Sequence, residues 1–296
     1  MTKKVSWILD ADIHGFFDNI SHEKLVELIE LRIADPRILR LIQKWLKAGV
    51  SEEGQWTETK VGTPQGAVIS PLLANLYLHY VLDQWVVEWR KKSAVGDVIL
   101  VRYADDFVLG FQHRREAERF LKQLQKRLAD YGLGLHSDKT RLIQFGRFAA
   151  EDRKREGKGK PETFDFLGFT HICGTIYKSG KFTVHRTTVG KRMRAKLRSL
   201  GVELRRRMQQ PIEETGKWLT QVVRGYYQYH AVPGNLSRLN TFRQELARYW
   251  RFTLGRRSQR SLWTWERFTP LIDHYLPQPR VLHPYPLARF YAKYPR

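Results

Sequence analysis

The sequence has little of three things: cysteine, long apolar runs and, in its second part, acidic residues. Cys173 is the one cysteine, which excludes an intramolecular disulfide and a cysteine metal cluster and fits a reducing compartment. No apolar run reaches the length of about eighteen residues that a membrane-spanning helix needs. The opening MTKKVSWILD enters a strand-like stretch without a secretory core. We therefore expect a cytoplasmic protein with no membrane segment.

The shortage of acidic residues is confined to one part of the chain. The formal net charge is +22, and residues 1–172 contribute little of it, with 27 basic and 24 acidic side chains. Residues 173–296 carry 25 basic and 6 acidic side chains. Such an imbalance is typical of a surface that binds a polyanion. Nucleic acid is favoured over an anionic membrane, because no basic amphipathic segment stands apart as an anchor.

The apolar pattern predicts an α+β first part and an all-helical second part. The 296 residues suffice for one large domain or two ordinary ones. Residues 149–162 are charged, contain Gly and Pro and lack periodicity, so we expect a flexible surface loop there. Strands are expected at 5–12, 98–103, 107–111 and, as a hairpin, 164–185, and helices at 22–33, 36–48, 71–92, 115–132, 189–208, 211–230, 235–255 and 261–276.

The stretch RYADDFVLG places Asp105 and Asp106 in a short turn between two apolar strands. Adjacent carboxylates repel each other, and a divalent cation is the strongest compensation. Asp12 ends another strand, in WILDADIHGFFDNI, and would supply a third hard oxygen ligand for a two-metal phosphoryl-transfer site; Asp10 and Asp18 are the other candidates. The alternative is a solvated turn, since Asp favours turns.

Five motifs in order resemble those of reverse transcriptases. YADD resembles the catalytic hairpin, and DADIHGFFDNISHEKL is similar to the first catalytic motif of the group II intron enzymes. GTPQGAVISPLLANLYLHYVLDQW, LGLHSDKTRLIQFGR and FDFLGF resemble the template, lysine and primer-grip motifs, and VRGYYQYHAVPGNLSRLNTFRQELARYWRFTLGRRS resembles the maturase thumb, or X domain. The resemblance implies a polymerase palm, an antiparallel sheet with helices, at 1–172, a primer-grip hairpin at 173–187 and a basic helical thumb or X domain at 188–296.

The resemblance also implies the chemistry of the acidic residues. Asp12, Asp105 and Asp106 would be the catalytic residues, and with the carbonyl of Ile13 they would hold two Mg²⁺ ions. The reaction would be attack of a primer 3′-hydroxyl on the α-phosphorus of a dNTP. The polymer would be DNA copied from an RNA template.

Other site residues follow from the same resemblance. Phe17 would exclude the sugar 2′-hydroxyl, unless it is a plain core aromatic. Gln65 and Gly66 would contact the templating pair, and Lys139 would steady or protonate the pyrophosphate, unless it is a solvent lysine. Leu167 and Gly168 would support the primer end; without the family they would be core strand.

The basic second part supplies the candidate RNA-binding residues. A charge run is usually a solvated face, but here almost no acidic residue balances it, and phosphate contacts explain it better. The ring-rich RGYYQYH could stack on unpaired bases, although some of its tyrosines must belong to the core. The candidates are Lys191, Arg192, Arg194, Lys196, Arg198, Arg224, Tyr227, Arg243, Arg248 and Arg251.

The resemblance starts only a few residues before the first aspartate motif, where family members carry a fingers region. We expect the fingers to be missing, as in a truncated product, an internally initiated fragment or one half of a split protein. A separate N-terminal fragment and a homodimer are the open alternatives for a partner. The expected function is an RNA-directed DNA polymerase and maturase that binds intron RNA. The alternatives are a non-enzymatic splicing cofactor with a retained palm, an inactive fragment, or another reverse transcriptase class.

Overall fold

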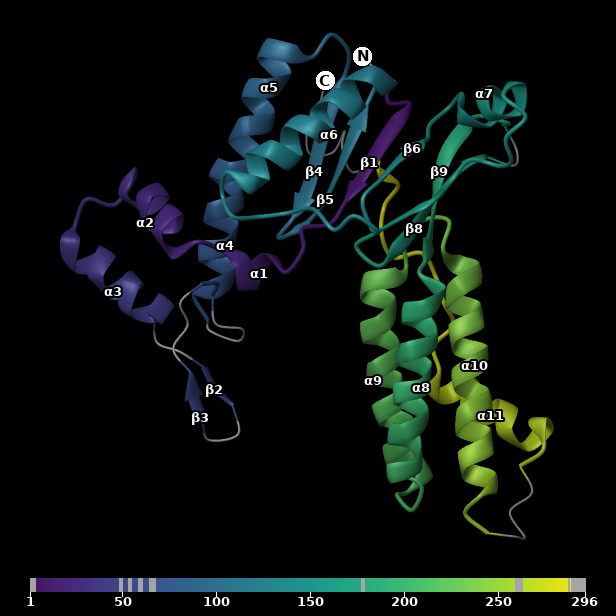
Figure 1. The fold of residues 1–296 in the computed structure, drawn as a ribbon. Helices are drawn as coiled ribbons and strands as arrows, with labels where there is room; N and C mark the ends of the chain where they lie inside the picture. Colours follow the sequence, from purple (N-terminus) through teal and green to yellow (C-terminus); the bar gives the residue numbers. More distant parts are fainter. Residues whose placement is uncertain are drawn as a thin grey trace. The chain divides into compact units, whose positions relative to one another are not determined.

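The computed structural model describes residues 4–47, 50–52, 55–57, 61–63, 68–176, 179–258, 263–286 and 288. The chain divides into two compact units between Phe166 and Leu167 (Figure 1). The first unit mixes helices with an antiparallel sheet, and the second consists largely of helices, which confirms the predicted fold class. The expected domain boundaries after residues 172 and 187 stay predictions.

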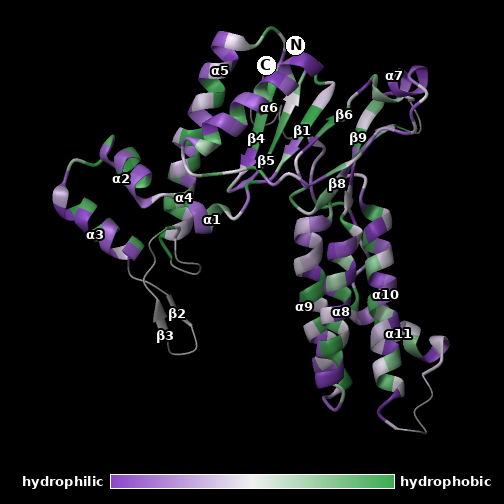
Figure 2. Cartoon of the chain, in the orientation of Figure 1, coloured by the Kyte–Doolittle hydropathy of each residue, from purple (hydrophilic) through white to green (hydrophobic). Residues whose placement is uncertain are grey.

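A four-stranded antiparallel sheet forms the centre of the first unit. Its order is β4-β5-β1-β6, and β1 lies in the middle with Trp7 opposite Phe111 and Ala11 opposite Phe107. Figure 2 shows hydrophobic residues along β4 and β5. The strands are β1 (Trp7–Ala11), β4 (Val98–Tyr103), β5 (Asp106–Phe111) and β6 (Arg141–Gln144); β2 (Val50–Glu52) and β3 (Gln55–Thr57) form a separate hairpin, and β7 (Phe164–Phe166) ends the unit.

Helices cover one face of this sheet. Phe111 of β5 packs against Phe120 and edge-on against Trp89, so that three rings close the core between sheet and helices. The Ser21 hydroxyl accepts a hydrogen bond from the Lys24 amide, which confirms the predicted helix cap. The helices are α1 (Phe16–Asn19), α2 (His22–Glu30), α3 (Pro36–Lys47), α4 (Ser70–Leu78), η1 (His79–Gln84), α5 (Trp85–Ser93), α6 (Arg114–Ala129) and α7 (Ala149–Arg155).

The predicted long helix at 71–92 is present but changes its winding in the middle. The π-helical segment η1 joins α4 to α5 without a break in direction of the chain. A π segment inserts extra residues into a turn, so it shifts which side chains face the sheet after it. Asp83 lies in this segment and its carboxylate reaches Arg102 of β4.

The prediction of a flexible loop over residues 149–162 is wrong for its first half. Residues 149–155 form α7, whose first residue, Ala149, is buried. Glu151 and Asp152 lie in the first turn, and three basic residues lie in the last. This order of charges complements the helix dipole and stabilises a short helix that has no apolar periodicity.

Among its described residues, the second unit contains a β-hairpin and four helices. Predicted hairpin and helices are both confirmed, and Figure 2 shows mixed polar and apolar faces on α8 to α10. Leu197, Leu219, Phe242 and Trp250 are among its buried core residues. The elements are β8 (Phe169–Thr175), β9 (Phe182–Thr188), α8 (Gly190–Arg206), α9 (Ile212–His230), α10 (Leu236–Gly255) and α11 (Trp265–Tyr275). Over the described residues, none of the helices combines the length and apolarity that crossing a bilayer requires.

Candidate active site

The turn between β4 and β5 is a two-residue loop of Ala104 and Asp105. Tyr103 and Asp106 pair across it and close the hairpin. Ala104 has a φ of 53°, in the left-handed region that an alanine adopts at a cost of about 1 kcal/mol. Backbone strain of this kind persists only where the surroundings hold it, and it is common at functional sites.

The register of the sheet brings Asp12 to the same end as this turn. Ala11, the residue before Asp12, lies opposite Phe107, the residue after Asp106. Side chains alternate along a strand, so the buried Leu9 and Ala11 face the helices while Asp10 and Asp12 face the opposite, open side.

The carboxylate of Asp10 is paired with an arginine of β6. Its Oδ2 lies 3.0 Å from Nη2 of Arg141, and burial raises the pKa of Asp10 in spite of this guanidinium group. The carboxylate is thus held in an ion pair with β6. Asp12 remains the acidic residue of this strand end that opens onto a cavity.

Asp12 and Asp105 line one pocket of about 470 Å³. The structure therefore brings together residues that are 93 positions apart in the sequence. Asp106 does not line this pocket, although it stands at the start of β5 beside it. Of the residues predicted for the site, those that line the pocket are Asp12, Ile13, Phe17, Asp105 and Lys139, and the alternative candidate Asp18 lines it as well.

The side chain of Lys139 is paired with Asp12. Its Nζ donates to Oδ2 at 2.8 Å, and the hydrogen bond with this carboxylate raises the pKa of Lys139. A main-chain hydrogen bond holds the segment before Lys139 close to Asp12, because the amide of His136 donates to the carbonyl of Asp12 at 2.8 Å. A cation therefore already lies against the Asp12 carboxylate.

The bridge between Ile13 and Leu135 does not use the carbonyl of Ile13. Ile13 forms an isolated antiparallel bridge with Leu135, and the two hydrogen bonds around it use the carbonyl of Asp12 and the amide of His14. In such a pair the residue's own N–H and C=O point away from the partner. The Ile13 carbonyl is thus directed away from Leu135.

Phe17 is positioned by the start of the GTPQG motif. The amide of Thr63 donates to the carbonyl of Phe17 at 2.8 Å, and the amide of Gly62 donates to the carbonyl of Ile20 at 2.8 Å. Gly62 has a φ of 88°, and a Cβ there would come within 2.7 Å of the Phe17 carbonyl oxygen, so only glycine permits this approach. Gln65 and Gly66 lie outside the described residues.

The donors at this pocket fit a divalent cation that is shared with a substrate. Within the described part of the chain, no three carboxylate, imidazole or thiol groups converge on one metal position. The oxygen ligands that line the pocket are the carboxylates of Asp12, Asp18 and Asp105 and the carbonyl of Ile13. Magnesium commonly uses one or two carboxylates together with substrate phosphates, so this oxygen set suits it.

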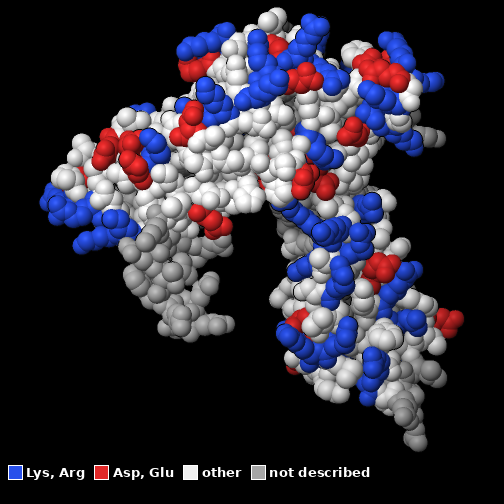
Figure 3. Space-filling model, viewed as in Figure 1, with Lys and Arg blue, Asp and Glu red and all other residues white. Residues whose placement is uncertain are grey.

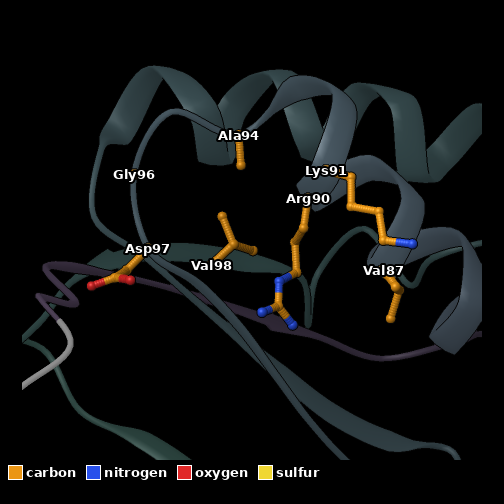
Figure 4. Close-up of a pocket in the computed structure, with 7 residues that line it drawn as sticks. All are labelled: Val87, Arg90, Lys91, Ala94, Gly96, Asp97 and Val98. Carbon is orange, nitrogen blue, oxygen red and sulfur yellow. The ribbon is translucent and has the colours of Figure 1, made fainter. Parts of the chain in front are cut away.

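A second pocket in the first unit has a different chemistry. It measures about 350 Å³ and is lined by α5 and the segment leading into β4 (Figure 4). Its one carboxylate, Asp97, accepts a hydrogen bond from the Lys4 amide, and Arg90 and Lys91 bring two cations. It lies at the end of β4 away from the Ala104 turn, so it does not belong to the aspartate site.

A family model decides the assignment that the motifs suggested. Residues 1–171 match the model of the reverse transcriptase (RNA-dependent DNA polymerase) family. The chain belongs to the reverse transcriptase family. The matched range contains Asp12, Asp105, Asp106 and Lys139, so the pocket lies within the part that defines the family.

Relatives of this reverse transcriptase include proteins encoded by introns. The group II intron-encoded protein LtrA of Lactococcus lactis subsp. cremoris is 50% identical over 86 residues, which are 29% of this chain and 14% of LtrA. An uncharacterized 91 kDa protein in the cob intron of Schizosaccharomyces pombe is 44% identical over 84 residues, 28% of this chain and 10% of that protein. The resemblance to group II intron reverse transcriptases is confirmed, and the chain matches only a small part of each relative.

A solved structure of apo telomerase from Candida tropicalis aligns with this chain at 13% sequence identity and a TM-score of 0.48. The alignment covers 92% of this chain and 46% of the telomerase chain.

Arg102 is a residue of the site that sequence reasoning missed. It faces the helices, and its Nη1 donates to the carbonyl of Ala104 at 2.7 Å and to Oδ1 of Asn75 at 3.0 Å. The strained turn is therefore stabilised by the side chain of Arg102, only two residues before Ala104. The sequence shows an arginine directly before YADD. It does not show that this arginine contacts Asp83 and Asn75, which precede it by 19 and 27 residues.

The predicted primer-grip residues begin the second unit. Leu167 and Gly168 have φ angles of 48° and 79°, so two consecutive residues are left-handed. The hydroxyl of Tyr229 donates to the Leu167 carbonyl at 2.8 Å, and the amide of Val189 donates to that of Gly168 at 3.0 Å. These contacts hold the turn to α8 and α9; a role at a primer end stays a prediction.

The predicted RNA-binding residues fall into two groups, those with contacts inside the second unit and those that are exposed. Tyr227 is 4% exposed with its hydroxyl on the Pro277 carbonyl, and Arg243 binds the Leu276 carbonyl and Asp273, so both serve the packing of the unit. Arg251 donates to the Trp263 carbonyl. Figure 3 shows Lys and Arg gathered over the second unit. The exposed residues are Lys191, Arg192, Arg194, Lys196 and Arg198 of α8, Arg224 of α9 and Arg248 of α10, the last paired with Glu245.

Proposed function

We propose that this chain carries the catalytic palm of a group II intron RNA-directed DNA polymerase and that its second unit binds RNA as a maturase. The observation that carries the proposal is the pocket that Asp12 and Asp105 share with Lys139. The reaction is nucleotidyl transfer from a dNTP to a primer 3′-hydroxyl, on an RNA template.

Each residue of the pocket has a task in this reaction. Asp12 and Asp105, with the Ile13 carbonyl and with Asp106 next to them, would hold two Mg²⁺ ions. When bound, Mg²⁺ lowers the pKa of the primer hydroxyl and neutralises the triphosphate. Lys139 moves from Asp12 to the leaving pyrophosphate and supplies a charge or a proton there. Phe17 closes the space beside the sugar.

The basic second unit supplies the affinity for RNA. The five cations of α8 stand exposed on the side of the helix away from Met193 and Leu197, which are buried in the core of the unit. Exposed cations of this kind gain affinity for RNA by releasing counterions from its phosphates. We propose intron RNA as the partner and Leu167 and Gly168 as the support of the primer end.

Primer extension tests the polymerase. The chain is incubated with an RNA template, a DNA primer, dNTPs and Mg²⁺, with and without a supplied N-terminal fingers fragment of a relative. Asp105→Ala and Asp12→Asn should each lower extension by a factor of about 1,000 or more, since each removes a ligand charge at the reacting phosphate. Glu151→Ala, an exposed change on α7, is the matched control.

The outcomes separate the two main functions. Extension that survives Asp105→Ala contradicts the assigned site. RNA binding with a steep salt dependence, but no extension with or without the added fragment, supports the splicing cofactor instead.

A further inference from the structure

The second unit contains a pocket that the polymerase site does not use. It measures about 590 Å³ and lies between the last two turns of α9 and the extended segment 277–282. Arg224, Gln228 and Arg280 are among the residues that line it. We name it the Arg224–Arg280 pocket.

The walls of the pocket are fixed by hydrogen bonds. The Tyr227 hydroxyl donates to the Pro277 carbonyl at 3.3 Å, and the amide of Leu282 donates to the Ala231 carbonyl at 2.9 Å. His283 Nε2 lies 2.6 Å from the Gln228 carbonyl. The extended segment is therefore attached to α9 on both sides of the opening, and the two arginines approach from walls that are held together.

The chemistry of the lining selects an anion with an apolar part. No acidic residue lines the pocket, and both arginines are exposed. A guanidinium group binds a phosphate through two parallel N–H donors. The rings of Pro277 and Pro279 and the side chain of Leu282 offer an apolar wall, and Gln228 and Gln278 offer donors and acceptors.

We infer that the Arg224–Arg280 pocket binds one unpaired nucleotide of an RNA strand, with its phosphate between the two arginines and its base against the apolar wall. A metal-bound triphosphate is a poorer match, because such a ligand brings a divalent cation and the pocket has no carboxylate for it. A base inside a duplex is also a poorer match, because its faces are stacked on its neighbours. The inference rests on the proposed RNA binding of the second unit and gives it a defined site.

The test compares two RNA probes on the full chain. Affinity for a single-stranded 20-nucleotide oligouridylate and for a perfect RNA duplex is measured by fluorescence anisotropy over a salt series. Arg224→Gln and Arg280→Gln should each weaken single-strand binding by about tenfold, a loss in the range for charge-assisted hydrogen bonds. Binding of the duplex should fall no more than it does in Arg115→Gln, an exposed change on α6.

The double variant tests whether both arginines hold the same phosphate. Two arginines on one phosphate release the counterions of that phosphate only, so each single variant should keep the slope of log affinity against log salt, because the other arginine still neutralises the phosphate. The double variant should lose a slope of about 0.7, the value for one phosphate of a single strand. Arg224→Lys should keep the slope but bind more weakly, because it keeps the charge and loses the fork. Additive losses in slope contradict the shared site.

Photocrosslinking separates this inference from the proposed function. With 4-thiouridine in the oligouridylate, crosslinks should map to residues 224–228 or 277–282 and disappear in the double variant. If the unaltered chain binds neither probe, the proposed RNA binding itself fails. If it binds both probes but the two single variants behave like Arg115→Gln and the crosslinks lie elsewhere, the pocket assignment alone is overturned.

Discussion

The guanidinium group of Arg102 and the carboxylate of Asp83 form a two-pronged ion pair. The Nε–Oδ1 distance is 2.8 Å and the Nη2–Oδ2 distance is 2.6 Å, and the Arg102 side chain is 13% exposed. The third nitrogen reaches the Ala104 carbonyl. A helix residue thus fixes the arginine that fixes the aspartate turn, so the position of Asp105 depends on η1.

Arg102→Gln should loosen this turn. We expect the free energy of unfolding to fall by about 2 kcal/mol, because Asp83 loses its charged donor in a half-buried place. If the proposed polymerase activity is present, kcat should fall by a factor of about 100, as expected for a small misplacement of a reacting group. Urea unfolding and primer extension measure the two effects. Arg102→Lys should keep the positive charge but lose the two parallel hydrogen bonds to Asp83. A lysine variant with full activity would therefore contradict the positioning role.

The sequence was sufficient for most elements and for the aspartate turn, because these are local. The cap at Ser21 and the two apolar strands around Asp105 need only short-range patterns. The helix α7 was missed, since seven charged and small residues carry no apolar period. The partners of Arg102 were out of reach for a different reason: they depend on the winding of η1, which periodicity does not report.

Lys139→Met should change the affinity of the site for a metal. The Lys139 ammonium group lies 2.8 Å from Asp12 and competes there with any other cation. Without nucleotide, we expect the variant to bind Mn²⁺ about tenfold more tightly than the unaltered chain, as removal of a like charge predicts. Mn²⁺ titration followed by electron paramagnetic resonance measures this. Lys122→Met, an exposed change on α6, should leave the affinity unchanged, and equal effects in both variants would show that only net charge matters.

Gly62→Ala should destabilise the first unit. The new Cβ would lie within 3 Å of the carbonyl oxygens of Phe17 and Asp18, at a φ of 88°. Strain and overpacking together should lower the free energy of unfolding by about 2 to 4 kcal/mol. Gly159→Ala meets open space and should change it by less than about 0.5 kcal/mol. Urea denaturation of both variants measures these changes. A Gly62→Ala protein that is as stable as the unaltered chain would contradict the tight contact.

The partly buried imidazole of His230 should make the second unit sensitive to acid. Burial lowers the pKa of His230 from 6.5 to about 4, and its ring lies 4.3 Å from that of Tyr226. The unfolded chain takes up this proton first, so the stabilising contribution is complete above pH 6.5 and is lost as the pH falls toward 4. His230→Gln should reduce the difference in unfolding free energy between pH 7.5 and pH 4.5. His113→Gln, an exposed change, should not; if it reduces the difference equally, His230 is not the source.

Phe17→Ala tests whether the pocket selects the sugar. Phe16 is 4% exposed and belongs to the core, whereas its neighbour Phe17 is only partly buried and lines the pocket with Asp12. If the ring blocks a 2′-hydroxyl, its removal should raise the use of ribonucleotides relative to deoxyribonucleotides by about 100-fold, which is what a steric contact with one hydroxyl can supply. The ratio of kcat/KM for UTP and dTTP in primer extension gives this number. Phe17→Tyr keeps the bulk and should keep the selectivity. A Phe17→Ala protein that still rejects ribonucleotides, while unfolding in urea like the unaltered chain, would assign the ring to packing alone and leave the choice of sugar to other residues.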